Sequence, residues 1–494
     1  MEFSTAILSL LILCLSCLIL LRIRRERKKR AQMPPGPSPL PLIGNLLRVN
    51  IKDMVTSLNA FSEKYCSVYT IYLGPTPSVV LNDYSSVKEA LIDQGEDFSG
   101  RGDVPIFFRF TQGNGIVFSN GEKLKILRRF TLLTLRNFGM GKKSIEERIL
   151  EEAQYLAKEF RHTKTLPFDP TLYLSRAVSN VICSIVFGNR FDYEDEDFRT
   201  LLSLINENFQ LISSIWGTMY NMFPSIMKHL PGPHNKVFDN FERLRLFVLE
   251  RIKMHEASFD PSCPGDFIDC FLTKIKQEEK NPNTYFHTET LVITTHNLFF
   301  GGTETVSTTL RYGLLILMKH PEVEAKLHEE IDSIIGRNRN PTIEDRGQMP
   351  YTDAVIHEIQ RFADIVPMSV LHSVIRDTQF RGYMFPKGTT VIPVLSSVHC
   401  DPNHYTEPTS FNPQHFLDEN NCFKKNEAFM PFSTGKRLCL GESLARMELF
   451  LFFVTLLQNF TFKLLISPEK IDLKPMISGL GKVPCQYQLS VIPR

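Results

Sequence analysis

A single cysteine, Cys439, follows a glycine-containing loop and directly precedes a long apolar segment. The loop runs from Phe432 through Gly435 and Arg437 to Cys439 and Gly441. Its glycines permit tight turns and close approach of the backbone to a flat ligand. A helix N-terminus stabilises a thiolate through its dipole and free N–H groups, and Arg437 adds a charge that can pair with a carboxylate. This setting favours a thiolate that binds a metal ion, such as the iron of a haem, over a buried structural cysteine.

A second group of chemically active residues interrupts a long apolar segment. Gly301 and Gly302 are followed closely by Glu304 and Thr305. Each glycine costs a helix about 1 kcal/mol relative to alanine, so we expect room for a ligand to offset this cost. Asn297, Gly301 and Thr305 are spaced four apart and share one helix face. The alternative is a kink with a threonine that bonds back to the helix carbonyls.

A third pattern is the pair Glu358 and Arg361, whose spacing of three places both charges on one helix face. Apolar residues flank the pair, which favours a buried ion pair. An exposed pair of small energetic value is the alternative.

These residues must be positioned by a chain that reads as mainly α with a small β portion, in one large unit from residue 42 to 494. Helices are predicted at Gly141–Phe160, Arg199–Met222, His234–Ser258, Thr288–Met318, Glu322–Ile335, Tyr351–Phe362 and Glu442–Gln458. Strands are predicted at Val68–Leu73, Ser78–Leu81, Gln379–Met384, Thr389–Val394 and the C-terminus.

The loop before Cys439, with the pattern Phe432-x-x-Gly435-x-Arg437-x-Cys439-x-Gly441, resembles the cysteine-ligand signature of the cytochromes P-450. The resemblance extends over the whole chain and is nearest to the vertebrate microsomal family two, especially its A-, B- and F-type branches. It implies the cytochrome P-450 fold and a non-covalent haem b. Cys439 would be the axial metal ligand, with Phe432 beside the haem and Arg437 on a propionate.

The resemblance also implies roles for the other two groups. Glu304 and Thr305 would relay protons for the activation of dioxygen. Glu358 and Arg361 would form a structural lock with His415, which stands where many members carry arginine.

Three further positions match propionate contacts of the family, namely Arg101, Arg128 and His372. A haem carries two carboxylates, and burying them requires charge-assisted partners. Leu124 replaces a tryptophan that usually donates to one propionate, which puts that single contact in doubt.

The substrate pocket is carried over from the family residue by residue and reads as apolar and aromatic with one amide. For any one of its members, plain core packing is the alternative. The residues are Phe107, Phe118, Phe209, Asn297, Phe300, Gly301, Val366, Val370 and Leu480.

The implied activity is that of a haem-thiolate monooxygenase, which inserts one oxygen atom of O2 into lipophilic small molecules. A haem-thiolate isomerase or dehydratase, or a non-catalytic haem-binding sensor, is the alternative.

No nucleotide-binding loop is present, so electrons must come from a separate protein. The resemblance implies NADPH-cytochrome reductase, with cytochrome b5 as a second donor in some members. A basic stretch is a candidate docking face, or else a solvated charge run: Lys123, Lys125, Arg128, Arg129, Arg136, Lys142 and Lys143.

The N-terminus predicts a membrane signal-anchor over residues 1–21, because about 20 apolar residues span a bilayer as a helix. Residues 22–41 follow as a basic stop-transfer segment and a proline-rich hinge. Basic residues stay on the cytoplasmic side, so we expect a single-pass protein of the endoplasmic reticulum whose catalytic domain faces the cytosol. A cleaved signal peptide is disfavoured, because its charges would precede the apolar run.

Composition adds two exclusions. The net charge of +2 gives no general argument for a nucleic-acid partner. The 10 scattered cysteines form no disulfide framework, and no C-x-x-C-H motif indicates covalent haem.

Overall fold

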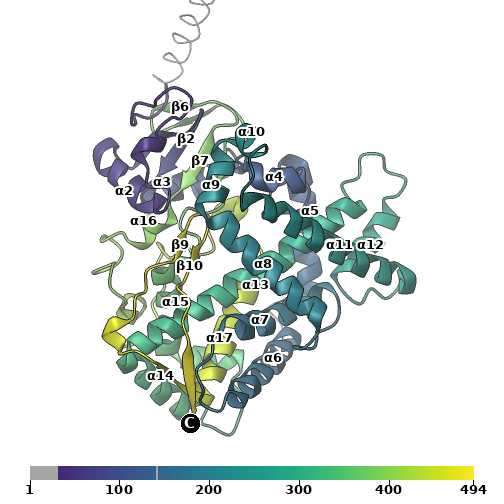
Figure 1. The fold of residues 1–494 in the computed structure, drawn as a ribbon, viewed down its shortest axis with the longest axis vertical. Coiled ribbons are helices and arrows are strands. Elements are labelled where there is room, and N and C mark those ends of the chain that lie inside the picture. Colours follow the sequence, from purple (N-terminus) through teal and green to yellow (C-terminus); the bar gives the residue numbers. More distant parts are fainter. Residues whose placement is uncertain (1–31, 141–142) are drawn as a thin grey trace, which may run out of the picture.

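The computed structural model describes residues 32–140 and 143–494, which form a mainly helical protein with a small β portion (Figure 1). The predicted membrane anchor over residues 1–21 and most of the basic segment after it lie outside these residues. Within the described part of the chain, every helix is too short or too polar to cross a bilayer.

The helices of the described residues differ widely in length, and the longest of them, α13, has 32 residues. They are α2 (Met54–Tyr65), α3 (Tyr84–Lys88), α4 (Pro105–Thr111), α5 (Gly121–Asn137), α6 (Lys143–His162), α7 (Thr171–Val186), α8 (Glu196–Ser213), α9 (Ile215–Met222), α10 (Pro224–Met227), α11 (His234–Ser258), α12 (Phe267–Gln277), α13 (Thr288–Lys319), α14 (Pro321–Ile334), α15 (Pro350–Ala363), α16 (Leu395–His399) and α17 (Glu442–Asn459).

Five strands form one mixed sheet in the order β1-β2-β7-β4-β3, in which only the β2–β7 pair is parallel. Three two-stranded sheets, β5–β6, β8–β11 and β9–β10, complete the β portion of the described residues. The strands are β1 (Val68–Leu73), β2 (Thr76–Leu81), β3 (Gly100–Arg101), β4 (His372–Ser373), β5 (Thr378–Phe380), β6 (Tyr383–Phe385), β7 (Thr390–Pro393), β8 (Phe460–Leu464), β9 (Ile477–Ser478), β10 (Lys482–Val483) and β11 (Leu489–Pro493).

Two of the predicted elements are wrong because each is broken in the middle. The predicted helix Arg199–Met222 is split between α8 and α9 at Ser214, whose hydroxyl accepts a hydrogen bond from the Trp216 N–H and caps α9. The predicted strand Gln379–Met384 is the hairpin β5–β6, because Arg381 and Gly382 both take positive φ and turn the chain.

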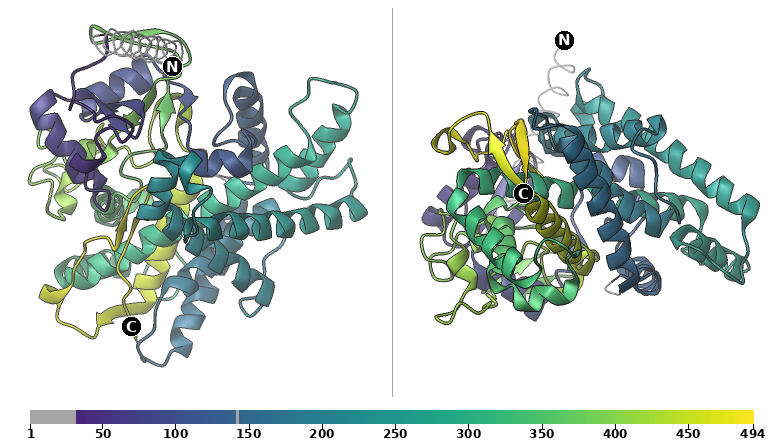
Figure 2. Two further views of the ribbon diagram at one scale, coloured as in Figure 1. Left: turned by 45° about the horizontal axis from the view of Figure 1, so that its top comes forward. Right: turned by 90° about the horizontal axis from the view of Figure 1, so that it is seen from below.

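Helix α13 runs through the middle of the helical part and packs against α7, α11, α15 and α17. Figure 2 shows from two further sides that the early strands and α2 lie at one end of the molecule, whereas α11 and α12 extend from the other. Most side chains of α13 and α17 are buried. A helix that is buried on most sides belongs in the core, so these two helices give the site a rigid base.

Candidate functional site

The loop before α17 holds Cys439 in a fixed position. Gly435 has a φ of +70°, and a Cβ there would collide with the backbone oxygen of Leu91, so only glycine fits. The Cys439 N–H donates to the Phe432 carbonyl at 3.0 Å and closes the loop. The sulfur therefore sits immediately before the first turn of α17, as the sequence predicted.

The surroundings of the Cys439 thiol act on its ionisation in opposite directions. Burial raises its pKa, and this effect outweighs the Gly441 and Glu442 backbone N–H groups and the charge of Arg128, which all lower it. The backbone N–H groups and Arg128 favour the thiolate as expected from the sequence, whereas burial opposes it. The Cys439 side chain is nonetheless accessible, so it faces an open space that the protein surrounds. A metal ion in that space would supply the positive charge that deprotonates a thiol.

Two of the predicted propionate contacts are cross-strand neighbours, because Arg101 on β3 pairs with His372 on β4. The Arg101 guanidinium donates to the Val117 and Val370 carbonyls at 3.2 and 2.9 Å. His372 is buried, and its Nδ1 donates to the Phe98 carbonyl at 2.9 Å.

Arg437 and Arg128 join this group from the cysteine loop and from α5. Arg437 donates to the Ser99 and Ser119 carbonyls at 2.7 and 2.8 Å. Arg128 donates to the Leu438 carbonyl, next to Cys439. Arg101, Arg128 and Arg437 are called the cation cluster below, and His372 lies beside them.

The cation cluster lacks an anion to balance it. Within the described residues, no carboxylate forms an ion pair with any of its arginines. Burial and the charges of Arg437 and Arg128 lower the pKa of Arg101 well below its usual range. The same kinds of effect lower the pKa of Arg437 to about 10 and that of His372 to about 3. The His372 Nε2 atom is buried without a hydrogen-bond partner. Such a cluster fits a ligand that brings buried carboxylates, as the two propionates of a haem would.

The glycine pair of α13 serves two different purposes. A Cβ on Gly301 would meet nothing within 4 Å, so this residue leaves open space as predicted. A Cβ on Gly302 would lie 3.1 Å from Ile182 on α7, so Gly302 permits close helix packing instead. The Thr305 hydroxyl donates to the Gly301 carbonyl at 2.7 Å, which is the back-bonding named above as the alternative.

Glu304 is a fully buried carboxyl beside that open face. Its Oε2 accepts from Asn206 Nδ2 at 3.4 Å, and its Oε1 has no hydrogen-bond partner. Burial raises its pKa to about 7, against the opposing effects of the Arg311 charge and the Asn206 hydrogen bond. A carboxyl with this pKa can both release and regain a proton near neutral pH.

Asn297 connects the open face of α13 with the cation cluster. Its Oδ1 accepts from the Ile116 and Val117 N–H groups at 3.1 and 3.3 Å. The Val117 carbonyl in turn accepts from both Arg101 and Arg437. Asn297 therefore fixes the wall of the site, and only its NH2 group remains for a ligand.

The predicted aromatic pocket residues pack in pairs. Phe107 and Phe118 stack with their ring centres 4.6 Å apart, and Phe209 meets Phe300 edge-on at 6.2 Å. Leu480 lies in the turn between β9 and β10, where a Cβ on Gly481 would collide with the Phe209 ring. This turn therefore lies against α8.

The remaining two pocket candidates lie on the segment between α15 and β4. The Ser369 N–H donates to the Val366 carbonyl at 3.2 Å and forms a turn. Val370 follows it, and its carbonyl holds Arg101. This segment therefore adjoins the cation cluster.

Glu358 and Arg361 form the buried pair that their spacing predicted. Two hydrogen bonds of 2.7 and 2.6 Å join the carboxylate to the guanidinium, and both side chains are almost fully buried. His415 Nδ1 lies 3.1 Å from the same carboxylate. Arg361 also donates to the carbonyls of His399, Pro408 and Ser410 and so ties α15 to the following loops. The exposed alternative is wrong.

Sequence reasoning missed two asparagines. Asn120 Oδ1 accepts from the Arg101 N–H at 2.7 Å and from Arg437 at 3.0 Å, and Asn206 donates to Glu304. Both contacts join residues far apart in the chain, and no local pattern signals them.

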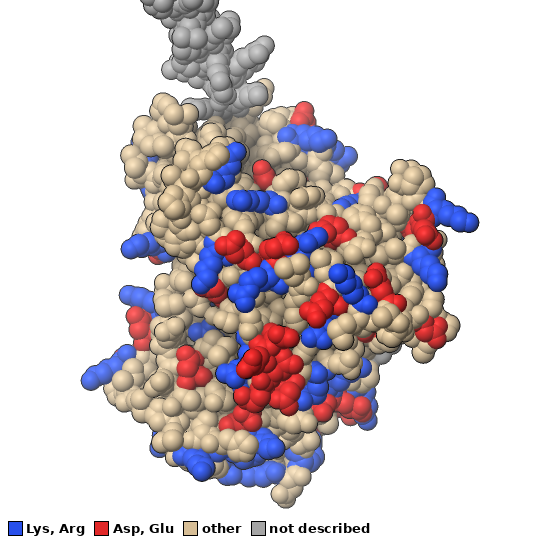
Figure 3. Space-filling view, turned by 45° about the vertical axis from the view of Figure 1, so that its right-hand side comes forward, with Lys and Arg blue, Asp and Glu red and all other residues tan. Residues whose placement is uncertain are grey.

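Only some of the basic side chains in the predicted docking stretch are free on the surface of the described residues. Arg128 is turned inward to the Leu438 carbonyl, Lys125 pairs with Glu122 at 3.0 Å, and Lys142 lies outside the described residues. On the face drawn in Figure 3, positive and negative side chains are mixed, with one compact acidic cluster.

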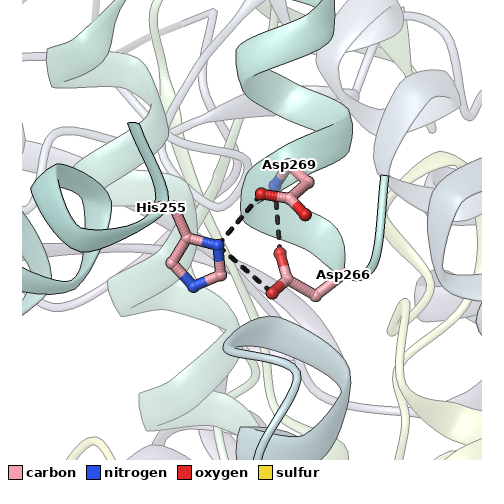
Figure 4. Close-up of side chains that lie close together, drawn as sticks. All are labelled: His255, Asp266 and Asp269. Carbon is pink, nitrogen blue, oxygen red and sulfur yellow. Dashed lines mark hydrogen bonds and ion pairs between the residues drawn. The ribbon is translucent and has the colours of Figure 1, made fainter. Parts of the chain in front are cut away.

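A separate group of titratable side chains joins α11 to α12 (Figure 4). His255 Nδ1 lies 3.0 Å from Asp269 and 3.4 Å from Asp266. Asp266 caps α12 by accepting from the Asp269 N–H, and Asp269 accepts from the Gly265 N–H. These groups satisfy one another and stabilise the start of α12.

The fold and the site fit the class of haem-thiolate proteins, with one cysteine before a buried helix, a cluster of cations that no carboxylate of the described residues pairs with, and an open helix face. Comparison with known proteins agrees. The family model for cytochrome P450 matches residues 34–491. Cytochrome P450 2F3 of Capra hircus is 57% identical over 493 residues and covers 100% of each chain. Cytochrome P450 2F2 of Rattus norvegicus is 59% identical over 458 residues, 93% of each chain.

The chain belongs to the cytochrome P450 family, and its relatives place it among the vertebrate family-two enzymes. It is a cytochrome P450 monooxygenase, and membership implies a haem with a cysteine thiolate ligand.

Proposed function

We propose that this enzyme inserts one atom of O2 into lipophilic small molecules, with electrons from NADPH supplied by a flavoprotein reductase. One observation supports the assignment above all others. Asn297 and the Val117 carbonyl connect the open face of α13 to the cation cluster, and Arg437 of that cluster lies two residues from Cys439.

Cys439 would hold the haem iron, beside Phe432, and the cation cluster would hold the two propionates. The haem supplies the reduction and cleavage of dioxygen. The protein contributes the ligand sulfur, the charges that retain the cofactor and an enclosed space from which bulk water is kept out.

Glu304 and Thr305 would supply the protons that this chemistry consumes. Glu304 holds a proton up to about pH 7, and the Thr305 hydroxyl stands on the face of α13 that Gly301 leaves open. Substrate, O2, NADPH and one proton then give hydroxylated product, water and NADP+.

The pocket favours small aromatic or aliphatic substrates, including foreign compounds. Two phenylalanine pairs, one stacked and one edge-on, are among its proposed lining residues, and the Asn297 NH2 group would be its polar contact. This combination orients a ligand that carries one hydrogen-bond acceptor.

The partners and the location follow from the sequence. The apolar run over residues 1–21 and the basic cluster after it support a single-pass anchor in the endoplasmic reticulum, with residues 42–494 in the cytosol. A reductase in the same membrane, with cytochrome b5 as an occasional second donor, would meet the catalytic unit there.

Thr305→Ala tests the assignment of the proton relay. Without the hydroxyl, electrons from NADPH should be diverted to peroxide, and the yield of product per NADPH should fall about fivefold or more. Product, peroxide and NADPH are measured together with purified reductase and a panel of small aromatics.

Thr309→Ala is the matched control, because Thr309 also bonds back to the helix, at 2.8 Å, one turn further on. It should leave the yield near that of the wild type. Equal yields in Thr305→Ala and the wild type would remove Thr305 from the mechanism. A reduced, carbon monoxide-treated sample without the band of a thiolate-bound haem would end the whole proposal.

A further inference from the structure

The buried carboxyl of Glu304 is linked to a polar pocket on the outer side of α8. The pocket lies between α7, α8 and α11, has a volume of about 510 Å³ and is lined in part by Asn206, Ser203 and Gln210. It is large enough to hold many water molecules. Of its lining residues, Asn206 is the one that also forms a hydrogen bond with Glu304.

Two hydrogen bonds with the same direction make this link. Gln210 Nε2 donates to Asn206 Oδ1 at 2.7 Å, and Asn206 Nδ2 donates to Glu304 Oε2 at 3.4 Å. Because both amides donate toward the carboxyl, they stabilise its ionised form. The second bond is long for N–H···O and is therefore the weaker of the two, so a turn of the Asn206 side chain that breaks it would let water from the pocket reach the carboxyl.

Glu304 has few other polar neighbours. Its Oε1 has no partner in the described part of the chain, and Arg311 is the charge that acts on it. Across the pocket, Glu207 is paired with Lys236 at 2.5 Å, and Arg243 lines the same wall. Among the described residues, Asn206 therefore joins the Glu304 carboxyl to this pocket by a hydrogen bond.

We propose that Asn206, held by Gln210, is the positioning residue through which water in this pocket returns a proton to Glu304. In this step the O–H bond of a hydronium ion or buffer acid in the pocket breaks, and a new O–H bond forms on the Glu304 carboxylate. The inference rests on the proposed role of Glu304 as a proton donor. It adds the place where protons enter and the residue that controls their entry.

Asn206→Leu tests the inference, because leucine keeps most of the side-chain volume and removes the amide. The yield of product per NADPH should fall about threefold or more and peroxide should rise. The pH midpoint of the yield should move upward, since a donor to the ionised carboxyl is lost. The solvent deuterium isotope effect on turnover should increase. Gln210→Leu should change the same quantities less.

Ser203→Ala is the matched control, because Ser203 lines the same pocket without a hydrogen bond to Glu304. It should behave as the wild type in every measurement. All variants are compared in the haem-loaded enzyme, after the reduced carbon monoxide spectrum has shown that each is folded.

The two levels of the proposal fail in different ways. If Glu304→Gln changes the yield but Asn206→Leu alters neither the yield, its pH midpoint nor the isotope effect, protons enter elsewhere and this inference is wrong. If Glu304→Gln also leaves the yield unchanged, the relay itself is wrong. A fall in yield for Asn206→Leu without a change in midpoint or isotope effect reduces Asn206 to a packing role and likewise overturns the inference.

Discussion

At the scale of single residues, this site is built from side chains whose burial destabilises the protein when no ligand is bound. Arg101, Arg437 and His372 have lowered pKa values, and Cys439 and Glu304 have raised ones, mainly because of burial. Perturbed groups gather at functional sites because catalysis needs them there. Because burying these groups lowers the stability of the protein, substitutions at these positions should change the free energy of unfolding measurably.

Glu304 should make the stability of the enzyme depend on pH. Its folded pKa of about 7 lies above the ordinary value of 4.5, so the folded state keeps a proton that the unfolded state releases. The free energy of unfolding should therefore fall as pH rises from about 4.5 to 7. The total decrease should be at most about 3 kcal/mol.

Glu304→Gln should remove this dependence. The variant should match the wild type near pH 4.5 and be more stable at pH 8, as measured by urea unfolding of the haem-loaded protein. A difference in stability that is the same at both pH values would contradict the assigned pKa.

At the scale of elements, α13 and α15 show how local sequence and packing share control. In α13 the two glycines look equivalent in sequence, but one faces open space and the other faces Ile182. In α15 the pair Glu358 and Arg361 is local, whereas its partners come from the end of α16 and from the segment that follows it.

Gly301→Ala and Gly302→Ala should therefore differ. Gly301→Ala should raise the free energy of unfolding by about 0.5–1 kcal/mol through helix propensity, and its methyl group should weaken the binding of bulky substrates. Gly302→Ala should bring no such gain, because Ile182 must move. Thermal unfolding and substrate titrations followed by the haem spectrum measure both effects. An equal increase in the free energy of unfolding for both variants would mean that Ile182 on α7 moves aside without an energetic cost.

Glu358→Gln should destabilise the enzyme by about 3–5 kcal/mol, because it leaves Arg361 buried without its counter-charge. Arg337→Ala is the control, since its ion pair with Asp332 is exposed and should contribute at most about 1 kcal/mol to stability. Urea unfolding compares the two, and a loss under about 1 kcal/mol in Glu358→Gln would show that the lock is dispensable.

At the scale of the whole molecule, cofactor and fold stabilise one another. The cation cluster draws its members from β3, α5 and the loop before α17, so it exists only in the folded chain. Its charges repel one another until carboxylates join them. A ligand that binds the folded state alone adds to stability by mass action.

Arg101→Met should have opposite effects on the two forms of the protein. It should raise the melting temperature of the haem-free protein, because one repelling buried charge is gone. It should lower that of the haem-loaded protein and weaken haem retention about tenfold, because a charged hydrogen bond is lost. Arg199→Met, on the exposed surface of α8, should change both forms equally and slightly. A fall in both forms for Arg101→Met would mean that Arg101 acts through packing.

Much of this protein was determined by its sequence. The glycine loop before Cys439, the spacing of Glu358 and Arg361 and the periodicity of α11, α13 and α17 are local signals, and each appears in the structure where it was predicted. Local spacing suffices because helix geometry alone places residues three or four apart on one face.

The tertiary structure decided the rest. It separated the roles of Gly301 and Gly302, turned Arg128 inward, broke the predicted helix at Ser214 and brought Asn206 and Asn120 to the site. It also showed that burial opposes ionisation of Cys439. These results depend on contacts between distant segments and on exclusion of water, and neither is set by the spacing of neighbouring residues.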